Sequence, residues 1–162
     1  MSSTQQADTQ MAEIDSVFHR LTGMPAISIG SLGGGRNSQV YQLTCADSRK
    51  YALKRHFRRD AGGRDPLATE FLALEFLWNN GVRCVPQPIA VDAEFGAAVY
   101  AFVDGQQVSS LDVDELDIGQ AVRFLARLKE LATGDGSLLL PPASSLPPRP
   151  STSTSGSTRL RL

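Results

Sequence analysis

The sequence has few cysteines and no long apolar run. Its two cysteines, Cys45 and Cys84, have neither the spacing of metal ligands nor the density of a disulfide scaffold, so we expect buried or half-buried free thiols. No apolar stretch approaches the roughly 18–20 residues that are needed to span a bilayer. The first residues, MSSTQQADTQ, lack the basic and apolar regions of a signal peptide. These absences argue against disulfide-rich, secreted and membrane proteins and predict a cytoplasmic one.

An excess of charge of one sign is also lacking, because 16 basic and 17 acidic residues leave a net charge of -1. Such a balance gives no general attraction to nucleic acid. The basic stretch KYALKRHFRRDAGGR is therefore interpreted as a solvated strand end and loop rather than a nucleic-acid patch. The acidic stretch DVDELD lacks the glycine and terminal glutamate of an EF-hand loop, and we interpret it as the start of a helix. The sequence thus predicts no nucleic-acid partner and no metal site.

What is present is a regular alternation of apolar patterns. Apolar residues recur at helical spacing in three segments, where we interpret the stripes as core, and alternate or cluster in five strand-like segments. The expected helices are 11–21, 65–79 and 114–132, and the expected strands are 26–32, 39–45, 50–57, 85–91 and 97–103. This order differs from the βαβ alternation of a doubly wound fold. It predicts an α+β fold: a five-stranded antiparallel sheet with one packed helix, preceded by a short helix and followed by a linker helix.

The two ends of the chain differ from its middle. Residues 1–10 are polar, and residues 137–162 contain no acidic and no aromatic residue. Segments of such composition cannot bury enough apolar surface to offset the entropy of ordering. We therefore expect a disordered N-terminus over 1–10, a folded unit over 11–134 and a disordered low-complexity tail over 135–162.

The stretch SLGGGRNSQVYQL contains the most informative turn. Gly33, Gly34 and Gly35 are followed by Arg36-Asn37-Ser38 and then by a strand. A Walker A loop or a Rossmann fingerprint would lead into a helix, so both nucleotide sites are excluded. Two interpretations stay open, namely an ordinary glycine turn and a kinase-like hairpin that covers the phosphates of ATP with backbone N–H groups.

A kinase-like hairpin requires a lysine on the next strand and a glutamate on the following helix. Lys54 lies in YALKRH, and Glu70 lies in TEFLALEFL, where Glu75 is a rival partner. We favour Glu70, because its spacing places it beside the apolar stripe that faces the sheet. Each residue alone is also compatible with a solvated side chain, but their order along the chain favours a Lys–Glu pair.

With these residues in place, residues 27–132 resemble the N-terminal lobe of the aminoglycoside phosphotransferase and choline kinase-like group. The resemblance rests on LGGGRNSQVYQL, YALKRH, ATEFLALEFLWNNGVRCVPQPI and AAVYAFVDG. It implies a protein-kinase-like N-lobe that binds ATP. In that lobe the segment from Gly33 to Ser38 would contact the phosphates, Lys54 would bind the α- and β-phosphates, and Glu70 would orient Lys54. Tyr100 would take the gatekeeper position, and backbone groups of Ala101 and Val103 would contact adenine.

The sequence departs from that family at the catalytic residues. The family carries a His-x-Asp segment with the catalytic aspartate and a later aspartate for Mg²⁺, whereas His19 is followed by Arg-Leu and His56 by Phe-Arg. We therefore assign no catalytic and no metal-binding residue. Intact members transfer the γ-phosphate of ATP to a hydroxyl of a small molecule with Mg²⁺. The expectation here is an ATP-binding lobe, truncated by a frameshift or deletion, that is inactive alone and self-associates through its exposed lobe interface. A non-catalytic nucleotide-binding or interaction module, or a truncated product without function, stays open.

Overall fold

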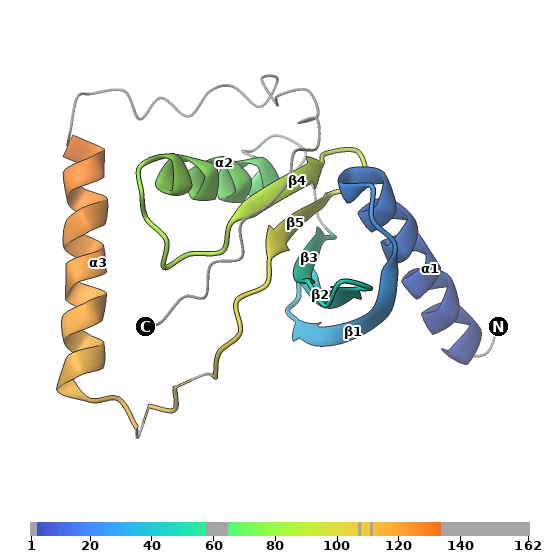
Figure 1. Cartoon of the computed structure of the whole chain (residues 1–162), viewed down its shortest axis with the longest axis horizontal. Coiled ribbons are helices and arrows are strands. Elements are labelled where there is room, and N and C mark those ends of the chain that lie inside the picture. Colours follow the sequence, from blue (N-terminus) through green and yellow to red (C-terminus); the bar gives the residue numbers. More distant parts are fainter. Residues whose placement is uncertain (1–2, 58–64, 107, 111, 134–162) are drawn as a thin grey trace.

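The fold is a five-stranded sheet with a helix on each face and a third helix beyond it (Figure 1). The computed structural model describes residues 3–57, 65–106, 108–110 and 112–133. The expected tail over 135–162 and most of the connection before α2 lie outside these residues. The elements in chain order are α1 (Ser3–Thr22), β1 (Ala26–Gly34), β2 (Ser38–Cys45), β3 (Lys50–His56), α2 (Pro66–Asn79), β4 (Pro88–Asp92), β5 (Ala97–Ala101) and α3 (Glu115–Thr133).

The strands lie in the order β1-β2-β3-β5-β4, and all four pairings are antiparallel, which confirms the expected sheet. Gly33 pairs with Val40, Val40 with Lys54 and Lys54 with Ala98. The glycine turn is therefore held in register with the middle of β3.

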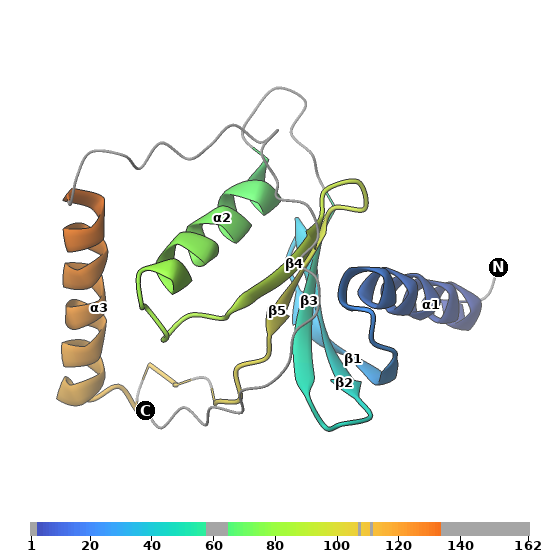
Figure 2. The same ribbon diagram turned by 45° about the horizontal axis from the view of Figure 1, so that its top comes forward.

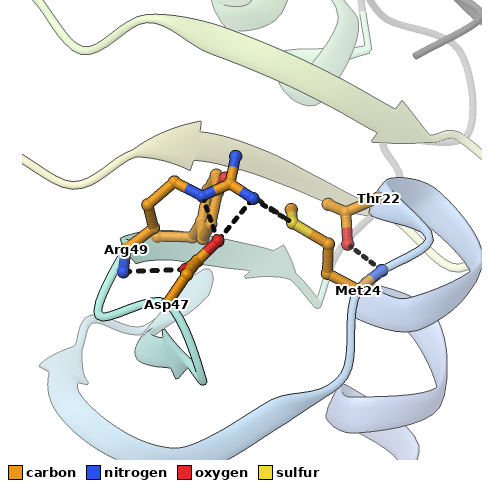
Figure 3. Close-up of polar contacts among 5 residues, drawn as sticks. Thr22, Met24, Asp47 and Arg49 are labelled. Atoms are coloured by element: carbon orange, nitrogen blue, oxygen red, sulfur yellow. Dashed lines mark hydrogen bonds and ion pairs between the residues drawn. The ribbon is translucent and has the colours of Figure 1, made fainter. Parts of the chain in front are cut away.

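At the other end of the sheet, the side chain of Arg49 in the β2–β3 turn makes two hydrogen bonds (Figure 3). It donates to the carboxylate of Asp47 at 2.6 Å and to the sulfur of Met24 at 3.1 Å.

Helix α1 packs on one face of the sheet, as Figure 2 shows. Because side chains alternate along a strand, every second residue of β2, β3 and β5 points toward this helix. Ile14, Val17 and Phe18 of α1 form the main core with them. The strand residues in this core are Tyr41, Leu43, Cys45, Tyr51, Leu53, Ala97 and Val99. The sheet thus has two packed helices, where the sequence predicted one.

The expected disorder over residues 1–10 was wrong for residues 3–10, because α1 begins at Ser3. Apolar periodicity marks only the segment from Met11 onward, which docks on the sheet. Once that segment is helical, each further residue adds a backbone hydrogen bond without a new nucleation cost. The polar half of α1 also contacts the sheet, since Gln10 Nε2 donates to the hydroxyl of Tyr41 on β2 at 2.6 Å.

Helix α2 covers part of the opposite face and begins where the sequence predicted. Asp65 caps it by accepting the backbone N–H of Leu67 at 3.0 Å, and Pro66 occupies the first turn. Leu67 and Phe71 pack against Ala98 and Tyr100 of β5. This second cluster is smaller than the α1 core, and its strand residues come from β5 and β4.

Helix α3 is amphipathic, but its apolar stripe is exposed, so the interpretation of that stripe as core was wrong. None of its residues, all of which the structure describes, is buried. The large exposed side chains of α3 are Leu116, Ile118, Val122 and Leu125. A reciprocal capping box starts the helix, with Asp117 N–H donating to Asp114 Oδ1 at 2.8 Å and Asp114 N–H to Asp117 Oδ2 at 3.2 Å. Helical periodicity indicates that a helix has an apolar face and a polar face, but it does not indicate whether another part of the protein covers the apolar face.

Both cysteines are free thiols, and Cys45 is buried as expected, but the expectation was wrong for Cys84, which is exposed. Within the described ranges, no helix combines the length and apolar character that a membrane span requires.

Candidate functional site

A charged cluster lies between β3 and α2. Leu53 points into the α1 core, so the alternation of β3 directs Lys54 to the α2 face. There Lys54 Nζ lies 2.5 Å from Glu70 Oε2. The hydroxyl of Tyr100 donates to the other oxygen, Glu70 Oε1, at 3.3 Å. Lys54 of β3 and Tyr100 of β5 therefore both bond to the carboxylate of Glu70, which fixes the position of the Lys54 ammonium group. Among the described residues, Lys54 pairs with Glu70 and not with the rival residue Glu75.

The cluster is partly open to solvent, which is what a binding site for a polar ligand requires. The side chains of Lys54 and Glu70 keep 27% and 32% of their accessible surface. Tyr100 is buried, and burial together with the nearby carboxylate of Glu70 raises the pKa of its phenol far above the usual range. Tyr100 therefore acts at this site as a neutral hydrogen-bond donor.

His56 is the fourth member of this cluster. It follows Lys54 by two residues on β3 and so lies on the same face. Its Nε2 atom is 3.9 Å from Glu70 Oε2, beyond hydrogen-bond distance. That atom is buried and has no hydrogen-bond partner among the described residues. Burial, and then the charge of Lys54, lower the pKa of the imidazole below 6.5.

The glycine turn closes the same end of the sheet. Gly33 has a φ of 111°, a conformation that favours glycine, and a Cβ on Gly34 would lie 2.6 Å from the carbonyl oxygen of Ser38. The turn is tied to the end of β3, because Phe57 donates its backbone N–H to Asn37 at 2.9 Å. Arg36 and Asn37 are exposed at the tip. The predicted phosphate-binding segment is therefore adjacent to the cluster, and its role stays a prediction.

The predicted hinge residues, Ala101 and Val103, lie at and beyond the C-terminal end of β5, away from the glycine turn. Ala101 donates its backbone N–H to the carbonyl of Gln87 at 2.8 Å. Because that N–H is already bonded within the protein, the carbonyl group of Ala101 is the backbone group that remains for the expected contact with adenine. Val103 lies beyond the end of β5, and 56% of its surface is exposed. Both contacts with adenine stay predictions.

Sequence reasoning missed two kinds of residue at this site. His56 was considered only as a possible His-x-Asp motif, although counting by two from Lys54 places it on the same face. The same count places Ala52 there, and Val40 joins it as the β2 partner of Lys54. These two apolar residues line the sheet beside the lysine. Strand alternation was the available signal in each case.

The described residues do not fit a Mg²⁺ site. They contain no group of three or more histidine, cysteine, aspartate or glutamate residues that could hold a metal ion. Glu70, the carboxylate of the cluster, is engaged by Lys54 and Tyr100. We therefore derive no chemical step that depends on a metal held by these residues.

The fold is similar to that of known kinases. A candidate fructosamine-3-kinase from Thermobifida fusca superposes with a TM-score of 0.50 at 19% identity, covering 59% of this chain and 33% of that one. The Rio2 kinase of Chaetomium thermophilum, solved as a complex described as ADP/Mg²⁺-phosphoaspartate, gives a TM-score of 0.53 at 23% identity, covering 72% and 40%. A further structure of that Rio2 kinase gives the same score and identity and covers 72% and 41%. The chain spans about a third to two-fifths of the length of these structures.

A comparison with curated protein sequences gave no match. The sequence profile of the phosphotransferase enzyme family, in contrast, matches residues 28–153, which include the glycine turn, Lys54, Glu70 and both predicted hinge residues. This match covers most of the chain and agrees with the kinase-like sheet. The chain belongs to the phosphotransferase enzyme family.

Proposed function

We propose that this chain provides the ATP-binding lobe of a small-molecule kinase. The observation that carries the proposal is the Lys54–Glu70 pair, held 2.5 Å apart beside a glycine turn that is in register with Lys54. A lysine ammonium on a strand is a point charge suited to phosphate oxygens, and a glutamate that fixes its position is the arrangement kinases use.

The ligand fits the donors that the chain offers. The cation of Lys54 and the unpartnered Nε2 of His56 lie on one face, next to a turn whose shape excludes a Cβ at Gly34. Ala52 and Val40 supply apolar surface on the same face for a base. Bound ATP would therefore place its phosphates toward the turn and its adenine toward Ala101 and Val103. The described residues contain no group of ligands for Mg²⁺, and we propose that the lobe alone binds ATP without transferring phosphate.

Calorimetric titration with ATP tests the proposal on the full 162-residue chain. Wild type should bind, and Lys54→Ala should lose at least about tenfold in affinity, the equivalent of roughly 1.4 kcal/mol. Arg55→Ala is the matched control, because Arg55 is the next residue on β3 and points to the other face, where it stacks on Phe95 at 4.3 Å. That variant should bind ATP like wild type.

Three results would contradict the proposal in whole or in part. Absence of ATP binding by the folded wild type would leave a protein-interaction module or a product without its own function. Equal binding by wild type and Lys54→Ala would remove the kinase-like role of Lys54. Release of phosphate from ATP, or its transfer to hydroxyl compounds, by the chain alone would contradict the proposal that the lobe binds ATP without transferring phosphate.

The proposed self-association rests on α3, whose exposed apolar side chains are described above. Patches of this kind mark interaction surfaces more often than isolated apolar residues do. Sedimentation of the full chain should show oligomers, and a monodisperse monomer would contradict this.

A further inference from the structure

We propose that the Nε2 atom of His56 donates a hydrogen bond to a phosphate oxygen of the bound nucleotide, and that His56 takes up a proton from solvent as the nucleotide binds. This inference deepens the proposed ATP-binding role and rests on it. It adds a second ligand group to Lys54, and it makes nucleotide affinity dependent on pH.

The first observation is an unsatisfied atom. Among the described residues, His56 Nε2 is the one buried side-chain nitrogen or oxygen without a hydrogen-bond partner. The imidazole keeps only 13% of its accessible surface, so water does not readily replace the missing partner. A buried polar atom without a partner costs roughly 1–3 kcal/mol, and a site that tolerates this cost calls for an explanation.

The second observation is the position of that atom. His56 shares its face with Lys54, pairs with Ser38 of β2, and is followed by Phe57, whose N–H holds the glycine turn at Asn37. Because His56 lies on β3 between Lys54 and the residue that holds the turn, we place an anion that contacts both beside His56. Glu70 Oε2, at 3.9 Å, is too distant to satisfy Nε2 and is already bonded to Lys54.

The third observation is the charge around the imidazole. Lys54 on β3 disfavours the protonated ring, and Glu70 on α2 and Asp65 at the start of α2 favour it. Burial adds the largest cost for the charged form, so the pKa lies below 6.5 in the free protein. Arg55 contacts Glu13 of α1 on the other face, and the β2 neighbour Ser38 is not titratable. Several phosphate charges beside Nε2 would reverse this balance and stabilise the imidazolium.

Proton NMR of the full wild-type chain tests the protonation without a substitution. The titration midpoint of the His56 Cε1 proton should rise by at least about one pH unit when ADP is added without metal. One unit corresponds to about tenfold tighter binding of ADP to the protonated form. The other histidine, His19, is an internal control, because it is exposed on α1 and lies on the opposite side of the sheet. The chemical shift of its Cε1 proton should not change when ADP is added at constant pH.

Calorimetry with ADP in buffers of different protonation enthalpy tests the proton uptake itself. Near neutral pH, wild type should take up a fraction of a proton more than His56→Gln does. The phosphates of ADP also titrate in this range, but their contribution is common to both proteins and cancels in the difference. His19→Gln should behave as wild type.

The outcomes separate this inference from the proposed function. If ADP binds in a Lys54-dependent manner and the His56 midpoint is unchanged, the inference is wrong and the ATP-binding role stands. If the folded chain binds no ADP, or binds it equally well after Lys54→Ala, both proposals are wrong.

Discussion

The two faces of the sheet differ in what their side chains do. On the α1 face, apolar residues from one helix and three strands form a closed core. On the α2 face, a small apolar cluster lies beside a partly exposed group formed by Lys54, Glu70, His56 and Tyr100. Fully burying such charges would carry a large desolvation cost, and an apolar core admits no polar ligand. The difference indicates that stability is concentrated on the α1 face, and the proposed ligand binding belongs to the α2 face.

The largest expected effect is on the α1 face. Phe18 is fully buried and its ring lies 5.4 Å from that of Tyr51. Phe18→Ala should lower the free energy of unfolding by about 3–5 kcal/mol, because it removes apolar contact and leaves a cavity. Urea unfolding measures this. Leu125→Ala, on a side chain of α3 that is 62% exposed, should change it by no more than about 0.5 kcal/mol. Equal losses in the two variants would contradict the assignment of the core.

A smaller effect is expected at the glycine turn that connects β1 and β2. A Cβ at Gly34 would lie 2.6 Å from the Ser38 carbonyl oxygen, so Gly34→Ala must shift backbone and should cost about 1–3 kcal/mol of unfolding free energy. Gly30→Ala is the matched control, because it lies on the same strand and its Cβ would meet no atom within 4 Å. If both variants unfold at the same urea concentration, the turn is not constrained as described.

Removal of the charged pair should cost little stability. Lys54→Met keeps the length of the side chain and removes its charge. Because both partners are partly solvated, we expect the free energy of unfolding to change by less than about 1 kcal/mol, while ATP binding falls. Urea unfolding and calorimetry on the same sample check the two parts. A loss of stability as large as that of Phe18→Ala would contradict the conclusion that the α1 face carries most of the stability.

The smallest effect is a slope of stability with pH. The pKa of His56 is lower in the folded chain than its ordinary value of 6.5, so the unfolded chain binds more protons between the two values. The free energy of unfolding without nucleotide should therefore fall as the pH drops below 6.5 and level off below the folded-state pKa. Urea unfolding at several pH values should show this slope in wild type. A variant His56→Gln that retains the full slope would show that other groups cause it.

The sheet, its strand order along the chain and the start of α2 could be predicted, because each depends on local patterns. Asp65-Pro66 is a helix start in any context, and glycines and polar turns separate the strands. The Lys54–Glu70 pair was also predictable, since a lysine strand followed by a helix with one glutamate beside its apolar stripe leaves few arrangements.

The remaining features depend on tertiary context. The polar first half of α1 has no apolar period, and it is helical because its second half docks on the sheet. Strand alternation places His56 on the Lys54 face, but the absence of a partner for its Nε2 among the described residues depends on tertiary packing. The exposure of α3 depends on what lies around it, which no helical period encodes.

The exposed helix α3 has a consequence for the time scale on which the chain opens. Its first turn is held by the Asp114–Asp117 capping box, and no residue of the helix is buried. Its backbone amides are therefore expected to exchange with deuterated solvent through local opening of the helix, on a time scale independent of the sheet. Amides of β5, whose residues 97–100 are all buried, should exchange only when the whole lobe unfolds. The chain would then consist of two cooperative units of different protection, joined near the predicted adenine contact.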